Sequence, residues 1–218
     1  MKFFLTGGTG FVGTALTKHL LENGHTVTIL SRRPPRQAGP SAIQIIQGDP
    51  TKPGPWQQQV PEHDVIINLA GSSIFVRWTP DNKRIIRESR VLTTQNVVAA
   101  LAAAKERQTR LFLSTSAIGY YGDRGDEELT EDSPPGHDFL ARVAQEWEAA
   151  ALAAQDLGVR TLVTRFGLVL GAGGGLLGSM VPLFKSFVGG ARGIGPAMAF
   201  LDRPDRSMAG LSVCHGTP

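Results

Sequence analysis

The fold is decided by residues 2–13, which read KFFLTGGTGFVG. Residues 2–6 are a short apolar run typical of a buried strand, and residues 11–23 repeat apolar side chains at helical spacing. The glycines between them follow the pattern G-x-x-G-x-x-G, which brings backbone N–H groups close to a pyrophosphate at a helix N-terminus. A glycine turn without a ligand is the alternative, but the flanking strand and helix favour a dinucleotide site. The predicted contacts are Gly7, Thr9, Gly10, Phe11, Val12 and Gly13.

The rest of the chain alternates between strand-like and helix-like segments. Thr79-Pro80 supplies an N-cap residue and a first-turn proline for a long helix. The alternation predicts an α/β fold, a Rossmann-type doubly wound parallel sheet with helices on both faces. Strands are predicted over 25–31, 42–47, 64–70, 111–115 and 159–166, and helices over 80–107 and 137–157.

The composition excludes several classes of protein. With 41% hydrophobic and 19% charged residues among 218, the chain is globular, and its one cysteine, Cys214, excludes a disulfide scaffold. The net charge is only +3 and no basic stripe carries interleaved aromatics, so no nucleic-acid partner is expected. The sequence contains no G-x-S-x-G nucleophile elbow, which disfavours a hydrolase. No metal site is expected either, because ligand spacing is missing at His19, His25, His63 and His137.

One apolar stretch has to be compared with a membrane-spanning segment. Residues 166–184 contain no charged side chain and reach the length of a marginal membrane span. Repeated glycines and Pro182 interrupt this stretch, so a strand, a glycine loop and a helix start explain it better. The apolar run at residues 1–5 is followed by Thr6-Gly7-Gly8, so it is too short to be the hydrophobic region of a signal peptide. We therefore expect a soluble, cytoplasmic protein without a membrane partner.

The end of the second predicted strand discriminates between the nicotinamide cofactors. NAD is held there by an acidic residue on the ribose 2′-hydroxyl, whereas NADP needs a cation for its 2′-phosphate. Residues 23–48 contain no acidic side chain, and Ser31, Arg32 and Arg33 occupy the deciding position. A hydroxyl and two guanidinium groups suit a phosphate, so NADP is predicted and NAD is less favoured. The alternative is that both arginines belong to a solvated loop.

Several runs together resemble a known family. They are Asn68–Gly71, Arg77–Thr79, Ser89–Thr94, Ser116–Asp123, Asp138–Ala141, Trp147-Glu148 and Arg165–Leu170. The sequence resembles the atypical extended short-chain dehydrogenases/reductases often labelled NAD-dependent epimerase or cell-division inhibitor homologues. The resemblance covers Met1 to about Gly193 and implies a Rossmann domain followed by a small substrate domain. Further predicted cofactor contacts are Leu69, Ala70, Gly71 and Arg165 from these runs, and Asp49 after the third predicted strand.

The resemblance leaves the reaction open. Typical members of the superfamily use a serine with a Tyr-x-x-x-Lys pair, in which lysine lowers the pKa of the tyrosine. This chain has no such pair, since Leu140 and Ala144 stand where the tyrosine and lysine align. The candidate catalytic residues are Ser116, which matches the superfamily's serine, Tyr120 and Tyr121, and Arg90 as their cationic neighbour. The alternatives are a turn serine and tyrosines that only line the pocket.

Arg77 and Trp78 are the candidate substrate residues. A tryptophan beside an arginine suits a planar anionic substrate through stacking and charge. The alternative is a tryptophan that packs at the helix entry.

We predict three parts: an NADP-binding domain over residues 1–170, the start of a truncated substrate domain over 171–193, and a tail over 194–218. The resemblance to the family ends before residue 194. When residues 194–218 are back-translated and the reading frame is shifted by one nucleotide, the translated sequence resembles the family again. We therefore interpret this tail as translated out of frame. The leading hypothesis is an oxidoreductase- or epimerase-like protein acting on an unknown carbonyl or sugar-like substrate. A non-catalytic NADP-binding sensor or interaction protein and an inactive truncated product are the alternatives, and the oligomeric state is left open.

Overall fold

The computed structural model describes residues 1–33, 42–171, 174, 175, 178, 185, 201 and 202. The chain divides into two compact units, Met1–Arg165 and Phe166–Pro218, so the second unit begins shortly before the boundary predicted after residue 170. In the second unit, β7 (Leu168–Gly171) pairs in parallel with β8 (Leu201–Asp202). Apart from β8, the predicted tail over 194–218 lies outside the described residues.

The first unit contains a six-stranded sheet in the order β3-β2-β1-β4-β5-β6. Phe4 of β1 lies opposite Thr28 of β2 on one side and Ile66 of β4 on the other, with the strands parallel. The strands are β1 (Lys2–Thr6), β2 (Thr26–Ser31), β3 (Ile43–Gln47), β4 (Val65–Asn68), β5 (Leu111–Ala117) and β6 (Arg160–Phe166). This topology confirms the predicted Rossmann-type sheet.

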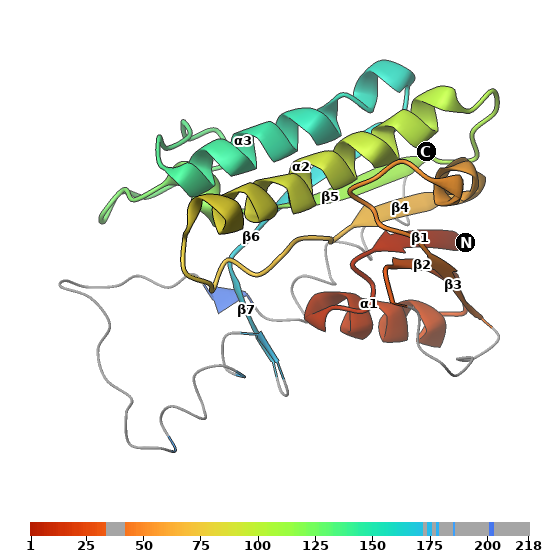
Figure 1. The fold of residues 1–218 in the computed structure, drawn as a ribbon, viewed down its shortest axis with the longest axis horizontal. Helices are drawn as coiled ribbons and strands as arrows, with labels where there is room; N and C mark the ends of the chain where they lie inside the picture. Colours follow the sequence, from red (N-terminus) through yellow and green to blue (C-terminus); the bar gives the residue numbers. More distant parts are fainter. Residues whose placement is uncertain (34–41, 172–173, 176–177, 179–184, 186–200, 203–218) are drawn as a thin grey trace. The chain divides into compact units, whose positions relative to one another are not determined.

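The helices cover both faces of this sheet (Figure 1). Helix α1 (Phe11–Glu22) lies on one face, and α2 (Pro80–Ala103) and α3 (Phe139–Leu152) lie side by side on the other. Right-handed crossovers explain this arrangement, because the chain moves one way from β1 to β2 and the other way from β4 to β6. The direction reverses between β1 and β4, where open α/β sheets bind their ligands.

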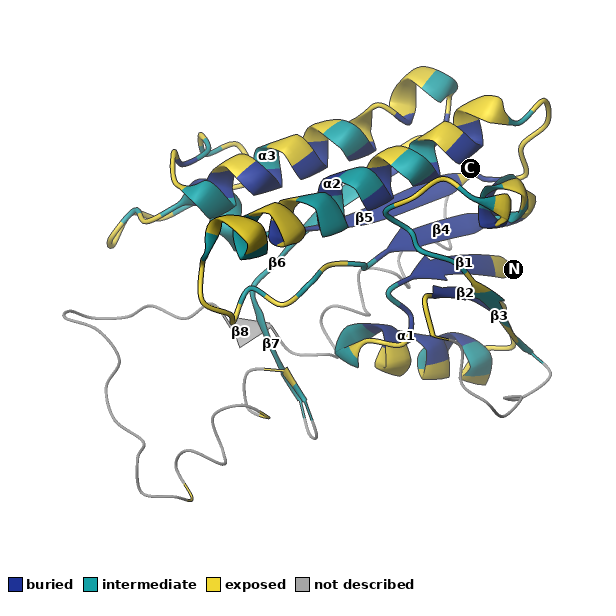
Figure 2. Cartoon of the chain, in the orientation of Figure 1, coloured by how far each residue is buried: buried dark blue, intermediate teal, exposed yellow. Residues whose placement is uncertain are grey.

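The main hydrophobic core lies between the sheet and the α2–α3 layer. Phe4, Ile66 and Phe112 come from neighbouring strands and are fully buried, in keeping with the dark blue strands of Figure 2. Val97 and Leu101 of α2 pack onto them. Every strand residue from Phe3 to Thr6 is buried, as expected for a parallel sheet covered on both faces.

Three local features differ from the sequence prediction. Residues 55–62, which look like a loop, form a 3-10 helix whose Trp56 and Val60 enter the core. Helix α2 ends at Ala103 rather than near residue 107, because Arg107 Nη1 donates to the Leu101 carbonyl and caps it. Helix α3 begins after Asp138, whose carboxylate accepts from the N–H of Ala141, and ends at Leu152 before a short 3-10 turn.

None of the described helices is both long and apolar enough to span a membrane. The part of the chain that the structure describes also holds no group of three or more His, Cys, Asp or Glu side chains placed to hold a metal ion.

Candidate cofactor and substrate site

The glycine loop after β1 is built for close backbone approach. Gly7 has a φ of 70°, and a Cβ there would lie 2.8 Å from the backbone nitrogen of Ala70. A Cβ at Gly13 would lie 2.6 Å from Gly8 Cα, so α1 packs onto the loop at a distance that only glycine allows. The first turn of α1 contains no acidic residue, which leaves the positive end of the helix available to an anion.

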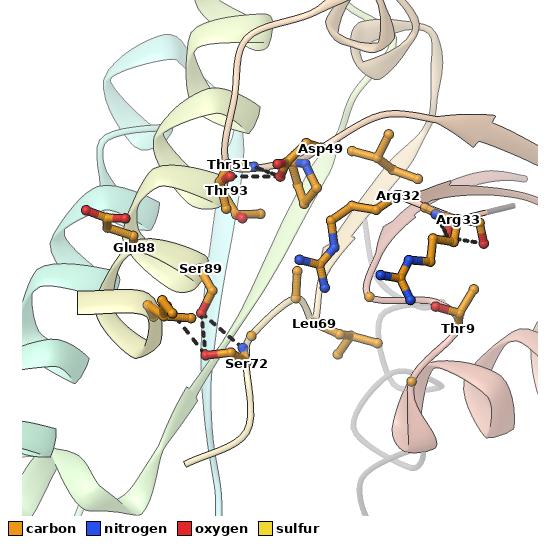
Figure 3. Close-up of a pocket in the computed structure, with 18 residues that line it drawn as sticks. Thr9, Arg32, Arg33, Asp49, Thr51, Leu69, Ser72, Glu88, Ser89 and Thr93 are labelled. Carbon is orange, nitrogen blue, oxygen red and sulfur yellow. Dashed lines mark hydrogen bonds between the residues drawn. The ribbon is translucent and has the colours of Figure 1, made fainter. Parts of the chain in front are cut away.

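A cleft of about 730 Å³ opens above this loop at the carboxyl ends of the strands (Figure 3). The predicted cofactor contacts that line it are Gly7, Thr9, Gly10, Ser31, Arg32, Arg33, Asp49, Leu69, Ala70 and Gly71. Residues that the sequence analysis did not identify complete the lining: Leu30, Pro50, Thr51, Ser72, Ile85, Glu88, Ser89 and Thr93. Phe11, Val12, Gly13 and Arg165 are not among the lining residues.

The floor of the cleft is fixed by a buried network around Asn68. Its Oδ1 accepts from Thr6 Oγ1 at 2.6 Å, and its Nδ2 donates to Thr94 Oγ1 at 2.8 Å. Thr6 Oγ1 in turn accepts from the backbone N–H of Ala70. The network joins β1, β4 and α2 and thereby holds the Leu69–Gly71 backbone against the glycine loop.

The end of β2 presents cations to the cleft. Ser31 is buried and its hydroxyl is tied to the backbone of Arg33, while the arginine side chains reach into the cleft (Figure 3). Asp49 lies nearby, with its carboxylate held by the hydroxyl of Thr51 at 2.7 Å. Burial raises the pKa of Asp49, but its hydrogen bonds to Thr51 and the charges of Arg32 and Lys52 outweigh burial and lower the pKa overall.

These residues fit a dinucleotide. The glycine positions form a cradle that a Cβ would fill, and two guanidinium groups stand where the ribose of such a ligand is bound. Thr93 also lines the cleft, and its buried hydroxyl has no hydrogen-bond partner among the residues that the structure describes.

A second polar cluster follows β5, the strand that carries Ser116. The Ser116 hydroxyl donates to Glu148 Oε1 at 2.6 Å. Arg165 binds the same carboxylate with two hydrogen bonds of 2.8 Å, from Nε to Oε1 and from Nη2 to Oε2. Ser116 and Glu148 are both buried, so this is a charge pair largely removed from water. The hydrogen bonds and charge of Glu148 raise the pKa of Arg165 against the opposing effect of burial.

Both tyrosines of the chain lie in this cluster. Arg165 Nη1 donates to the Tyr121 hydroxyl at 2.7 Å, and the Arg165 guanidinium carbon lies 3.6 Å from the centre of the Tyr120 ring. The rings meet edge to face at 5.3 Å. The cation beside the tyrosines is therefore Arg165, which we had expected at the cofactor, whereas Arg90 had been expected here. Neither this role of Arg165 nor that of Glu148 was predicted from the sequence.

Arg90 instead lies behind the wall of the cleft. Its Nη1 donates to the Ile86 carbonyl and its Nη2 to the Ser72 carbonyl, and its guanidinium lies 5.4 Å from the centre of the Trp147 ring. Burial lowers the pKa of Arg90. The hydroxyl of Ser89 donates to the hydroxyl of Ser72 at 3.1 Å, a second hydrogen bond, besides that of Arg90, between α2 and this wall.

The candidate substrate residues lie in the loop before α2. Trp78 is 43% exposed, donates from Nε1 to the Ile74 carbonyl and packs edge to face on Phe139 at 5.5 Å. The backbone carbonyl of Arg77 accepts a hydrogen bond from Asn82 Nδ2, and the side chain of Arg77 is exposed. Neither residue lines the cleft, so their predicted role stays a prediction.

Comparison with known families agrees with this architecture. Residues 3–189 match the model of the NAD dependent epimerase/dehydratase family. The chain belongs to this epimerase family. The match runs across the cleft, the Ser116 cluster and the start of the second unit, and it confirms the resemblance inferred from the sequence motifs.

Named members of the epimerase family are similar over most of this chain. The chloroplastic SDR39U1 homologue of Arabidopsis thaliana is 37% identical over 206 residues, which cover 89% of this chain and 56% of that protein. YfhF of Bacillus subtilis is 39% identical over 196 residues, covering 89% of this chain and 63% of YfhF. The chain thus spans somewhat more than half the length of these relatives.

Solved structures agree with the family assignment. Human epimerase family protein SDR39U1, crystallised with NADPH, has a TM-score of 0.76 at 32% identity and covers 94% of this chain, which spans 66% of the human chain. UDP-glucuronic acid 4-epimerase of Bacillus cereus has a TM-score of 0.84 at 18% identity, with coverage of 100% and 74%, and shows likeness of fold alone.

Proposed function

We propose that this chain is the cofactor-binding part of an NADP(H)-dependent oxidoreductase or epimerase that acts on a carbonyl or sugar-like substrate. The observation that carries the proposal is the pair Arg32 and Arg33 at the end of β2, in a cleft whose glycine loop suits a pyrophosphate. The NADPH bound by human SDR39U1 supports the same cofactor.

The phosphate preference follows from the charge at the end of β2. Arg32 and Arg33 offer planar donors suited to a phosphate. Asp49, the acidic residue in this part of the cleft, already accepts two hydrogen bonds from Thr51. A ribose 2′-hydroxyl would therefore compete for that carboxylate, whereas a 2′-phosphate would meet the guanidinium groups of Arg32 and Arg33.

The second cluster supplies the groups for proton handling. When bound, the nicotinamide cofactor provides or accepts a hydride. Ser116, whose own proton is donated to Glu148, accepts a hydrogen bond from a substrate hydroxyl, and Tyr121 donates a proton from a hydroxyl that already accepts from Arg165. In this scheme Arg165 is the cation beside the acid, a part that lysine plays in the superfamily motif.

Fluorescence titration of the full chain with NADPH and NADH tests the cofactor assignment. We expect NADPH to bind at least tenfold more tightly, because each charged hydrogen bond contributes ~1.5 kcal/mol or more. Equal affinities, or tighter binding of NADH, would refute the assignment.

The second candidate function is a non-catalytic NADP-binding sensor. It is favoured by α3, where Leu140 and Ala144 replace the tyrosine and lysine of the superfamily motif. A screen of carbonyl and sugar substrates, followed by nicotinamide absorbance, separates the two functions. The enzyme hypothesis expects turnover that falls at least a hundredfold in Ser116→Ala. If none of the carbonyl and sugar substrates is turned over although NADPH binds tightly, the sensor is favoured.

A further inference from the structure

Arg90 places a positive charge directly behind one wall of the cofactor cleft. A Cβ at Gly71 would lie 3.0 Å from the guanidinium carbon and 3.1 Å from Nη2. The same guanidinium donates to the Ser72 carbonyl at 3.1 Å and lies over the Trp147 ring. Since Gly71 and Ser72 line the cleft, only one layer of backbone separates this charge from a bound ligand.

No carboxylate neutralises this charge in the part of the chain that the structure describes. Each acidic side chain on α2 and α3 pairs with another arginine: Asp81 and Glu88 with Arg84, Glu146 with Arg87, and Glu148 with Arg165. The contacts of Arg90 are two backbone carbonyls and an aromatic face. An arginine remains protonated in such a site, so the cleft wall keeps a full positive charge.

The topology indicates which half of a dinucleotide meets this wall. The pyrophosphate belongs over the Gly7–Gly13 loop of β1, and the adenosine half belongs at the end of β2, where Arg32 and Arg33 lie. A ligand that crosses the switch point from β2 past β1 extends toward β4 and β5. Gly71 and Ser72 follow β4, so the nicotinamide half lies on the side of Arg90.

We infer that Arg90 makes the site prefer the reduced cofactor, NADPH, over NADP⁺, an inference that rests on the proposed function. The two forms differ by one unit of positive charge on the nicotinamide ring, and the guanidinium repels that charge. For unit charges ~10 Å apart at an effective dielectric constant of about 20, this corresponds to about a tenfold difference in affinity. NADPH would then occupy the site and would supply a hydride to an electrophilic carbon of the substrate, while Tyr121 would supply the proton to the substrate oxygen.

This order of events distinguishes a reductase from an epimerase. Epimerisation through a transient ketone begins with the oxidised cofactor, which removes a hydride from the substrate. Tighter binding of NADPH by tenfold raises the potential of the bound two-electron couple by about 30 mV. The same shift makes bound NADPH a weaker hydride donor, so Arg90 selects the cofactor form that occupies the resting site and does not by itself favour reduction over epimerisation.

The experiment compares the dissociation constants of NADPH and NADP⁺ for the full chain and for three variants. In the unmodified protein we expect NADPH to bind at least fivefold more tightly than NADP⁺. Arg90→Gln should reduce this ratio about tenfold, whereas Arg90→Lys should retain most of it because the charge remains. Arg87→Gln removes an exposed arginine one turn away, paired with Glu146, and should leave the ratio unchanged.

Each outcome bears on the inference. Equal affinities in the unmodified protein overturn it without any variant, which covers the case in which Arg90→Gln fails to fold. A ratio that stays within twofold in a folded Arg90→Gln also overturns it, even though the proposed function stands. Failure of the unmodified protein to bind either form overturns the proposed function itself, and the inference with it.

Discussion

The hydroxyl of Ser116 donates to Glu148 Oε1 at 2.6 Å, and both side chains are buried. The serine that we expect at the substrate thus depends on a carboxylate 32 residues later in the chain. That carboxylate depends in turn on Arg165, which holds both of its oxygens. A change at Glu148 therefore acts on Ser116 and on the cation beside the tyrosines at once.

Glu148→Gln should lower the free energy of unfolding by about 3 kcal/mol, because it leaves Arg165 largely buried without its counter-charge. Urea denaturation of the full chain measures the change. Glu146→Gln is the matched control, since its partner Arg87 is 46% exposed and such pairs contribute ~0.5 kcal/mol. Similar losses in the two variants would contradict a structural role for the buried pair.

Arg33→Gln should weaken NADPH binding about tenfold and leave NADH binding unchanged, because only NADPH carries the 2′-phosphate. Fluorescence titration with both cofactors measures the effect, and Arg32→Gln should behave similarly. Arg110→Gln serves as the control, since this exposed arginine precedes the amino end of β5, whereas the cleft lies at the carboxyl ends of the strands. A parallel loss of NADH affinity would show that the arginine supports the loop rather than the phosphate.

Gly13→Ala should destabilise the protein by about 2 kcal/mol and abolish cofactor binding, because its Cβ would collide with the backbone of Gly7 and Gly8. Thermal unfolding with and without NADPH measures both effects. In the control Gly119→Ala, the nearest atom to the new Cβ is Leu140 Cβ at 3.6 Å, an ordinary contact. A Gly13→Ala variant that melts and binds like the control would refute the close packing of α1 on the loop.

His63 should make the protein less stable as the pH falls below about 6.5. Its ring is buried, with Nδ1 2.8 Å from the Gln59 carbonyl and Nε2 2.7 Å from Thr28 Oγ1, and burial lowers its pKa from the ordinary 6.5. Between the lowered pKa of the folded state and 6.5, the unfolded chain binds more protons than the folded one. The free energy of unfolding contributed by His63 is therefore complete above pH 6.5 and decreases on acidification.

Urea midpoints measured between pH 7 and pH 5 test this dependence. His63→Gln keeps a polar side chain without a titrating ring, so the slope in this range should become smaller. His137→Gln, at an exposed histidine, should retain the slope of the unmodified protein. An unchanged slope in His63→Gln would assign the pH dependence to other groups.

Local sequence patterns were sufficient to predict the sheet, the glycine loop and the cations at the end of β2. The loop and the first helix adjoin in sequence, and the arginines follow directly after their strand, so each feature depends on neighbours along the chain. The 3-10 helix over residues 55–62 could not be predicted in the same way. Its proline and glutamine content is typical of a loop, and only the burial of Trp56 and Val60 in the core stabilises it.

The Ser116 cluster shows the same limit at the candidate site. The tyrosines were correctly associated with the loop after β5, but their cation was sought on α2. Arg165 lies 44 residues after Tyr121 and meets it only because β6 lies beside β5 in the sheet. Trp147-Glu148 is one of the runs that carry the family resemblance. Its position in the sequence does not indicate that the Glu148 carboxylate binds both Ser116 and Arg165.

Arg165 is the last residue of the first unit, and its partners precede it by 17, 34 and 44 residues. During synthesis on a ribosome, Glu148 and the tyrosine loop emerge before the guanidinium that joins them. A carboxylate without its counter-charge resists burial, so packing of α3 against β5 is incomplete until residue 165 has been added. Vectorial synthesis therefore makes the cluster of Ser116, Glu148 and Arg165 the last part of the first unit to assemble, after the glycine loop and the first strands have formed.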